Sequence, residues 1–343
     1  MVKEKTTTMT IGEDFVAKAK KAGTMDRIMS VAPLAVLVLL IVVFSILCPI
    51  MRQASFLSAG NVANILNQLA VPLCVALGLT WVIMLGSIDL SINGVVGMAG
   101  CLAGVFVANS AFSYNLGILG ILIALLSGVA AGLVVGIVHV KLRVPSFMAS
   151  LAVMFICTGL GRISYYSKIV QLQEPALLWL GKNSFLGIPM LTWIALLMLL
   201  ICYLVQEYTA FGRHVYAVGT NEAVPRSVGV NVDWVKIRVF MLAGLMSAIA
   251  GVIAMIRLGM AQIQLGNNKM FPAQAAVVIG GTALTGGKGG VHRTLVGVLI
   301  MTILDNGLTF LGVSAYIRDG VQGLIILLCV IITSVRGKTV IAK

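Results

Sequence analysis

The residues best suited to act on a solute are a few polar side chains embedded in apolar sequence. Asp89, Ser91 and Asn93 follow one long apolar run, and Asp305 with Asn306 lies well inside another. Polar and ionisable groups in such surroundings are costly and usually face a cavity. Together with an amide from the loop 257–270, the predicted lining of a solute pathway is Asp89, Ser91, Asn93, Gln262, Asp305 and Asn306.

Each of these candidates also has a purely structural alternative. Asp89 could cap the helix that follows it, because a carboxylate is favourable at a helix N-terminus. Asp305 could form a hydrogen bond between two helices of a bundle. Gln262 lies in a loop rich in Gln and Asn, which suits hydroxyl-bearing ligands or a docking protein and equally suits plain solvation. The sequence leaves both kinds of role open.

Patterns typical of catalysis and of cofactor binding are missing. Gly287-Lys288 lacks the rest of a phosphate-binding loop, because Thr282 stands at the glycine position five residues earlier and Gly289 follows the lysine. The three histidines are not spaced as metal ligands. No nucleophile–base arrangement or carboxylate pair is visible. We expect no enzyme activity, no metal and no cofactor in this chain.

The composition is that of a helical membrane protein. Hydrophobic residues make up 59% of the chain and charged residues only 10%, whereas soluble domains average about 25% charged. The mean hydropathy is +1.06. The long apolar runs favour spanning helices over a β-barrel, whose strands alternate apolar and polar residues. The net charge of +13 is spread over loop positions without a basic face, which argues against nucleic-acid binding.

The expected fold class is all-α, a polytopic bundle of about ten transmembrane helices. A lysine-rich tail at residues 1–28 precedes the membrane domain at 29–336, and a short tail at 337–343 follows it. The expected spans lie at about 29–50, 62–86, 94–109, 116–140, 145–165, 188–206, 239–257, 271–284, 295–311 and 318–335.

The distribution of positive charge predicts the orientation of these spans. With the N-terminus in the cytoplasm, seventeen of the 24 Lys and Arg residues fall in cytoplasmic segments. Cytoplasmic loops of membrane proteins carry such an excess. Both termini are therefore expected in the cytoplasm, together with the long polar run 207–238.

The polar run 207–238 separates two apolar spans. A loop of this length cannot lie in hydrocarbon, because its backbone polar groups would go unsatisfied. Residues 222–227 could form a short helix, with Asn221 as its N-cap and Gly229 as its stop. A short surface helix on a cytoplasmic loop offers a contact site for another protein.

Two glycine patterns indicate how the helices pack and where they break. Gly128, Gly132 and Gly136 recur every fourth residue, a spacing that lets helix backbones approach closely, and packing within the bundle is favoured over a dimer interface. The segments Val82–Gly94 and Val278–Gly290 each end an apolar span in Gly, Ser and Thr. Breaks at corresponding places in two halves of a chain point to a transport pathway.

Several stretches together resemble a known family, the permease subunits of ribose-type monosaccharide ATP-binding-cassette (ABC) importers. The matching stretches are GSIDLSINGVVGMAG from Gly86, VPSFMASLAVMFICTGL from Val144 and TAFGRHVYAVGTNEAVPRSVGVNVDWVK from Thr209. AAVVIGGTALTGGKGGVHRTLVGVLI from Ala275 and DNGLTFLGVSAYIRDGVQGLIILL from Asp305 complete the resemblance, in the order that the family has them. The superfamily also holds permeases for branched-chain amino acids.

This resemblance implies a sugar permease of the bacterial inner membrane. Such a permease pairs with a second permease subunit, receives its solute from an extracytoplasmic binding protein and is driven by a separate cytoplasmic ATPase that holds ATP and Mg²⁺. Family permeases have a coupling helix at the position of 221–229. Glu222 and Arg226, four residues apart, would share one face of it and pair together or reach the partner. The residues expected to couple to the ATPase are Asn221, Glu222, Arg226 and Gly229.

Departures from the family pattern bear on the solute. Asn93 stands where the family has glycine, Val224-Pro225 replaces paired alanines, and Met270-Phe271-Pro272 replaces Glu-Leu-Asp. Related systems move pentoses, hexoses, inositol, nucleosides or furanone-type signalling molecules. The alternative functions are a superfamily permease for nucleosides or branched-chain amino acids, and a proton- or ion-coupled secondary transporter of a small polar solute.

Overall fold

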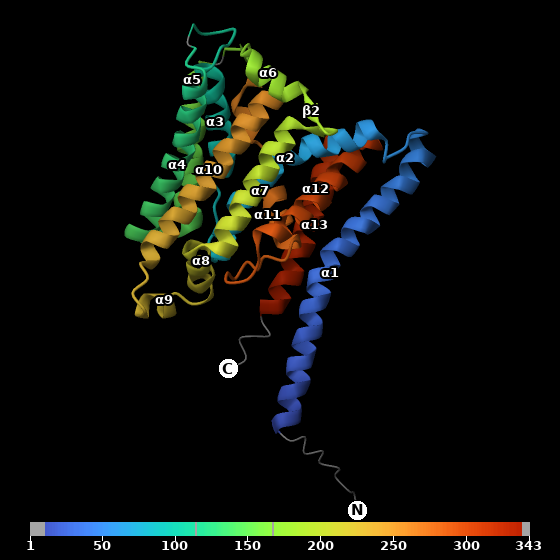
Figure 1. Cartoon of the computed structure of the whole chain (residues 1–343), viewed down its shortest axis with the longest axis vertical. Helices are drawn as coiled ribbons and strands as arrows, with labels where there is room; N and C mark the ends of the chain where they lie inside the picture. The colour runs from blue at the N-terminus through green and yellow to red at the C-terminus, as the bar shows by residue number, and fades with distance from the viewer. Residues whose placement is uncertain (1–10, 114, 167, 338–343) are drawn as a thin grey trace, which may run out of the picture.

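The computed structural model describes residues 11–113, 115–166 and 168–337 and shows a bundle of α-helices (Figure 1). Each of the ten expected spans overlaps with one helix. These helices are α1 (Ile11–Arg52), α2 (Ala59–Met84), α3 (Ile92–Phe106), α4 (Ile118–Lys141), α5 (Ser146–Tyr165), α7 (Met190–Tyr208), α10 (Val232–Leu258), α11 (Met270–Ile279), α12 (Val291–Phe310) and α13 (Ala315–Gly337).

Seven helices of the described chain are long and apolar enough to cross a membrane. They are α2, α4, α5, α7, α10, α12 and the part of α1 from Ala32 to Arg52. α3 has 15 residues and α11 has 10, fewer than the roughly 20 of a full crossing. α11 ends at Ile279, with Gly280 as its C-cap, so the helix stops earlier than the expected span 271–284.

Segments expected to be irregular contain further elements. The stretch after α5 holds α6 (Pro175–Lys182) and short strands, and η1 (Ile263–Gly266), a 3₁₀ turn, precedes α11. The polar run 207–238 holds both α8 (Ala210–Thr220) and α9 (Ala223–Ser227). The strands form two antiparallel pairs, β1 (Val170–Gln171) with β4 (Met260–Ala261) and β2 (Ser184–Phe185) with β3 (Ile188–Pro189).

The expected tails are only partly described. α1 begins at Ile11, so it takes in most of the predicted N-terminal tail. Residues 1–10 of that tail, and residues 338–343 of the predicted C-terminal tail, lie outside the described residues.

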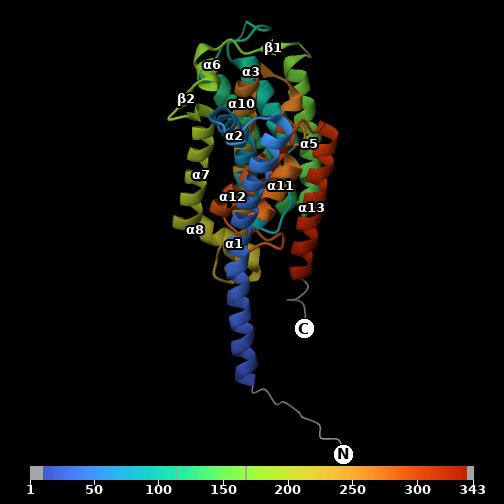
Figure 2. The ribbon, with the colours of Figure 1, turned by 90° about the vertical axis from the view of Figure 1, so that its right-hand side faces the viewer.

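The two ends of the bundle carry different elements. α6 and the short strands lie at one end, here called the α6 end (Figures 1 and 2). α8, α9 and the C-terminal end of α13 lie at the other, here called the α9 end, and α1 extends past the bundle on that side (Figures 1 and 2). The polar run 207–238 and the two outermost described parts of the chain thus share one end of the molecule.

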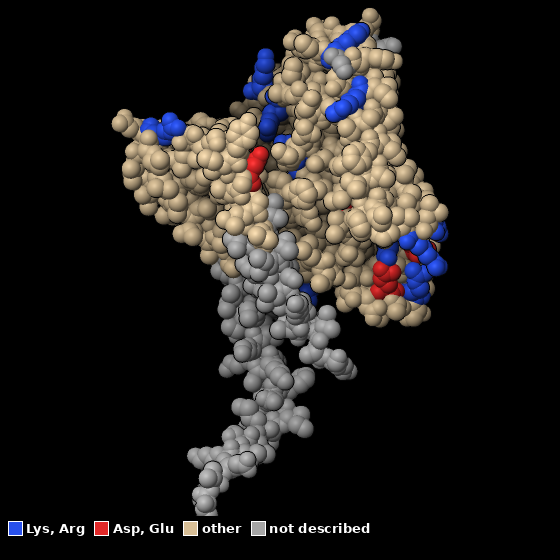
Figure 3. All heavy atoms as spheres, turned by 180° about the vertical axis from the view of Figure 1, so that it is seen from behind, with Lys and Arg blue, Asp and Glu red and all other residues tan. Residues whose placement is uncertain are grey.

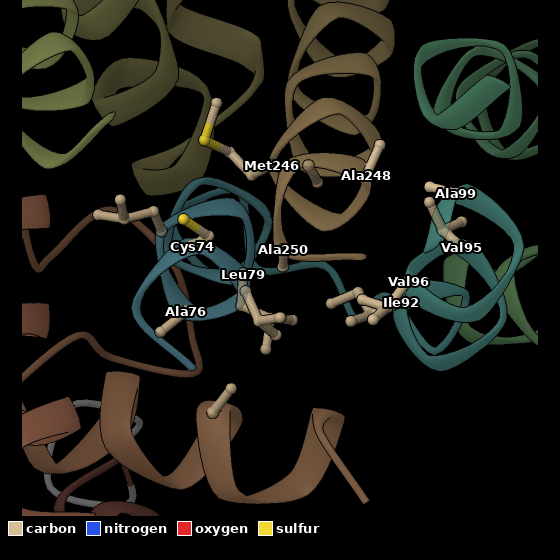
Figure 4. Close-up of a cluster of buried hydrophobic side chains, with 14 of the residues drawn as sticks. Cys74, Ala76, Leu79, Ile92, Val95, Val96, Ala99, Met246, Ala248 and Ala250 are labelled. Carbon is tan, nitrogen blue, oxygen red and sulfur yellow. The ribbon is translucent and has the colours of Figure 1, made fainter. Parts of the chain in front are cut away.

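The core is built around α2 and α10. In each helix, 78% of the most apolar 18-residue window is buried, as expected for helices with neighbours all round. Figure 4 shows side chains of α2, α3 and α10 meeting in this core, among them Leu79, Val96 and Ala250. α4, α5 and α7 keep large apolar side chains such as Leu126 and Phe155 on the outside, which suits a lipid-facing surface.

The glycine repeat of α4 packs within the chain, against α10. A Cβ at Gly128 would overlap the Gly244 carbonyl, and one at Gly132 would overlap the Phe240 carbonyl and lie 2.9 Å from Met241 Cα. Gly136 faces Ile237 in the same row. The predicted use of this repeat for packing inside the bundle is therefore confirmed, because the two backbones touch where the glycines recur.

A single methyl group tests this contact. Gly132→Ala should lower the free energy of unfolding by about 1–3 kcal/mol, the usual cost of overpacking a close-packed interface. Gly159→Ala on α5 is the matched control, since a Cβ there meets nothing within 4 Å and alanine is the better helix former. Thermal unfolding of the two purified variants in detergent measures the difference. Equal melting temperatures would show that the α4–α10 contact is looser than described.

Candidate functional site

The polar run 207–238 forms a compact helical segment. Thr209 ends α7 and caps α8, its hydroxyl accepting from the Gly212 N–H at 3.3 Å. Gly212 permits the sharp reversal, because a Cβ there would overlap the Gln206 backbone. The predicted helix at 222–227 is confirmed as α9. α8 was not predicted from the sequence.

α9 is fixed at both of its ends. The Asn221 side-chain oxygen accepts from the Ala223 N–H at 3.0 Å. The N-cap residue is Glu222, one position after the predicted Asn221, because Pro225 has no N–H to donate to the Asn221 carbonyl. Gly229 has φ +84°, a left-handed conformation that glycine adopts without strain. Val230 N–H donates to the Pro225 carbonyl at 3.0 Å, which closes the turn into α10.

The charged residues of α9 pair with α10 and not with each other. Lys236 Nζ lies 2.5 Å from Glu222 Oε1, and Arg226 Nη2 lies 3.1 Å from Asp233 Oδ1. Exposed pairs of this kind contribute about 0–1 kcal/mol each. Their effect here is to orient α9 against the first turns of α10.

This orientation leaves an apolar face on α9 uncovered. Val224 is 60% exposed and Val228 is 74% exposed, while Pro225 between them is buried. Charged side chains gather at the α9 end of the molecule, at the lower right of Figure 3. An apolar face with a charged rim is the usual arrangement of a protein contact site.

The interrupted segments 82–94 and 278–290 meet at the α9 end, next to α8. Gly287 N–H donates to the Met84 carbonyl at 2.9 Å. Gly219 of α8 sits against both, since a Cβ there would overlap the Met84 carbonyl and lie 2.7 Å from Gly287 N. A Cβ at Gly286 would likewise lie too close to the Gly219 carbonyl oxygen and to Gly86 N. Three backbone segments therefore touch with no side chain between them, and we call this contact the glycine interlock.

A polar network reinforces the glycine interlock. Gln206 is buried, and its side-chain oxygen accepts from the Val291 N–H at 2.8 Å, at the start of α12. Its amide nitrogen donates to the Tyr216 hydroxyl at 2.6 Å, and that hydroxyl donates to the Gly289 carbonyl at 2.8 Å. Burial and the nearby Glu207 carboxylate raise the pKa of Tyr216, so the phenol keeps its proton. The network joins α7 and α8 to the segment 278–290.

The three candidates near α3 form hydrogen bonds at the N-terminal ends of α3 and α11. Asp89 is buried, and its Oδ1 accepts from the Ser91 N–H at 2.8 Å and the Ser91 hydroxyl at 2.6 Å. Asn93 Oδ1 accepts from the Met270 N–H at 3.0 Å, at the first residue of α11. Asp89 and Ser91 thus order the turn before α3, and Asn93 links α3 to α11. A further role in a pathway stays a prediction for all three.

The remaining candidates lie on two elements, Asp305 and Asn306 on α12 and Gln262 at the start of η1. Asp305 on α12 accepts from Arg318 Nη1 at 3.3 Å and Gln322 Nε2 at 3.1 Å, both on α13. Asn306, the next residue, is buried, and its side-chain oxygen has no hydrogen-bond partner among the described residues. Gln262 is half-buried at the start of η1. The expected interhelical hydrogen bond of Asp305 is therefore present.

A polar cavity of about 550 Å³ lies between α2, α11, α12 and α13. Of the six predicted pathway residues, only Asp305 lines it. Sequence reasoning missed the other polar residues of this cavity, although a signal exists in the spacing of Asn64, Asn67 and Gln68 on one face of α2. Further polar residues of the lining are Thr302, Arg318 and Gln322.

In the part of the chain that the structure describes, no three His, Cys, Asp or Glu side chains are grouped so that they could hold a metal ion. The site consists instead of a contact helix, the glycine interlock and a polar cavity.

Sequence comparison decides the family. A family described as "Branched-chain amino acid transport system / permease component" matches residues 61–330. The chain belongs to this permease family. The motif-based resemblance is confirmed, and the permease is an all-α, multi-pass protein of the bacterial inner membrane and a subunit of a transport system.

Individual relatives cover most of the permease. Ribose import permease protein RbsC of Escherichia coli strain K12 is 37% identical over 313 residues, 90% of this chain and 95% of the relative. RbsC of Bacillus subtilis strain 168 is 35% identical over 312 residues, 90% of this chain and 93% of the relative. Autoinducer 2 import system permease protein LsrC of Salmonella paratyphi B is 30% identical over 289 residues, 84% of this chain and 82% of the relative. No solved structure is significantly similar to the permease.

Removing one hydroxyl tests the network beside the glycine interlock. Tyr216→Phe leaves the Gly289 carbonyl without its donor and should cost about 1–3 kcal/mol of stability, as for other buried groups left unpaired. Tyr208→Phe is the control, because Tyr208 is 72% exposed at the end of α7. Thermal unfolding of the purified permease should show a lower melting temperature for the Tyr216 variant alone. Two unchanged melting temperatures would mean that the network does not hold α8 in place.

Proposed function

We propose that this permease is the membrane subunit of an ATP-driven importer for a monosaccharide or a similar polyol. The relatives that cover nine-tenths of the chain at 35–37% identity are named for ribose import, which favours a sugar over a branched-chain amino acid. A second permease subunit, a cytoplasmic ATPase carrying ATP and Mg²⁺, and an extracytoplasmic solute-binding protein complete the proposed assembly.

The orientation in this proposal has the α9 end in the cytoplasm. The excess of Lys and Arg in the segments assigned to that side supports it. α8, α9 and the described end of α13 share that end of the bundle (Figure 1). The α6 end then faces the solute-binding protein.

The observation that most strongly supports a contact with the ATPase is the exposed apolar face of α9. Val224 and Val228 point away from the bundle on a helix whose charged residues are occupied by α10. Apolar side chains that become buried at the centre of an interface contribute most of its binding energy. The ATPase therefore docks on these two valines, and Glu222 and Arg226 orient the helix that presents them.

The glycine interlock gives this docking a mechanical consequence. At the interlock, backbone atoms of α8 lie against the end of α2 and against Gly286-Gly287 of the segment 278–290. Side chains of α8 add to this contact, since Phe211 stacks on Trp81 of α2 and Tyr216 bonds the Gly289 carbonyl. Backbone atoms in direct contact cannot yield by changing rotamer, and close-packed interiors transmit displacements in this way. A movement of α9 driven by the ATPase is passed through α8 to both interrupted segments at once.

One charge on α9 tests the proposed docking. Val224→Asp should prevent co-purification of the ATPase and abolish uptake, because a carboxylate would be desolvated in the interface. The control is Leu186→Asp at the α6 end, where the side chain is 78% exposed. It should keep the ATPase bound. Parent-like assembly and ATP-driven uptake by the Val224 variant would contradict the assignment of α9 as the docking helix.

A further inference from the structure

The polar cavity between α2, α11, α12 and α13 has a lining suited to hydroxyl groups. Asn64, Asn67 and Gln68 of α2 line it together with Gln322 of α13. Side-chain amides offer both donors and acceptors, as a hydroxyl does, and so match a ligand that carries several hydroxyl groups. The volume of about 550 Å³ lies within the roughly 300–1,000 Å³ of small-molecule sites.

Three side-chain atoms of the lining residues are buried without a partner. The Thr302 hydroxyl, the side-chain oxygen of Asn67 and Arg318 Nε have no hydrogen-bond partner among the described residues. Thr302 is only 6% exposed and lies on the same helix as Asp305, one turn away. A buried polar atom costs free energy unless it is hydrogen-bonded, so a ligand hydroxyl that reaches one of these atoms gains a hydrogen bond that the protein does not already make.

The charges around the cavity nearly balance. Arg257, Lys269 and Arg318 stand against Asp305 and Asp319, and Asp305 is paired with Arg318 at 3.3 Å. Charges of both signs line the cavity, so a free anion or a free cation would meet a like charge there as well as a counter-charge. An uncharged ligand enters without that repulsion.

The cavity lies toward the α6 end of the bundle. Its floor is apolar, formed by side chains such as Val71, Ala276 and Val298. Farther along α2 and α12, toward the α9 end, the hydroxyl oxygens of Thr80 and Thr294 lie 2.7 Å apart, and the glycine interlock follows. The cavity therefore ends above packed structure, on the side from which the solute-binding protein delivers its ligand in the proposed importer.

We propose that this cavity is a weak binding site for an uncharged, polyhydroxylated solute, contacted by Asn67, Thr302, Gln322 and the Asp305–Arg318 pair. This inference rests on the proposed function and gives the solute a position within one permease chain. The lining contains no aromatic ring on which a sugar could stack. Affinity is consequently low, as a transport pathway requires, because a solute held tightly would not leave.

Removing the unpartnered hydroxyl is the sharpest test. Thr302→Val breaks no hydrogen bond of the protein, so the fold is retained, whereas ligand affinity should fall about two- to tenfold for one lost hydrogen bond. Thr302→Ser keeps the hydroxyl and should bind as the parent does. Thr158→Val is the matched control, since Thr158 on α5 bonds only its own helix, at the Met154 carbonyl.

Binding is measured by saturation-transfer difference NMR on the permease in nanodiscs. The probes are D-ribose, D-xylose, D-glucose and myo-inositol, with L-leucine as the zwitterionic comparison. The site is supported if at least one polyol binds, weakens with Thr302→Val and is unaffected in the other two variants. Equal affinity in all variants, binding of L-leucine alone, or no binding of any polyol overturns it.

Uptake by the complete importer separates this inference from the proposed function. If the importer takes up one of these polyols while Thr302→Val changes neither its binding nor its uptake, the cavity assignment fails and the proposed function stands. If the importer takes up none of them under ATP, the proposed function fails, and the site proposed with it.

Discussion

The contact on which the rest of the structure depends is the approach of three backbones at Met84, Gly219 and Gly287. The Gly287 N–H bonds to the Met84 carbonyl, and α8 lies against both where a side chain of any size would intrude. Apolar burial can hold α2 and α10 together without special geometry, because it is non-directional. The interlock is different, since it requires glycines at fixed positions and joins segments about two hundred residues apart in sequence.

The interlock divides the permease into two functional ends. On one side lie α8 and α9, with an apolar pair of valines directed outward. On the other side, beyond the Thr80–Thr294 pair, lies the polar cavity with its unpaired Asn67 and Thr302 atoms. Because backbone atoms are in direct contact at the interlock, a displacement of α9 would move the helices that line the cavity. The importer proposed above would use this connection between its ATPase and the cavity.

Local patterns allowed much of this structure to be predicted. The apolar runs located the spans because burial in lipid demands them, and Gly229 located the end of α9 because it needs a left-handed backbone. The network around the interlock was not predictable, since the partners of Gln206 and Asn93 lie 85 and 177 residues away. Thr302 could not be predicted as a lining residue from the sequence, because a single hydroxyl residue in an apolar helix forms no recognisable pattern. Glu222 and Arg226 were expected on one helix; Glu222 is the N-cap of α9 and Arg226 lies within it. The turn at Gly229 brings α10 close enough to pair with both.

The most direct test of this account adds one methyl group at the interlock, as Gly219→Ala, in the fully assembled importer reconstituted in proteoliposomes. The measurement is the amount of solute imported per ATP hydrolysed. A Cβ at this position overlaps the Met84 carbonyl, so the account predicts that the ATPase still binds and turns over while import per ATP falls several-fold. An unchanged ratio, with the parent's melting temperature, would contradict the claim that the glycine interlock transmits the movement.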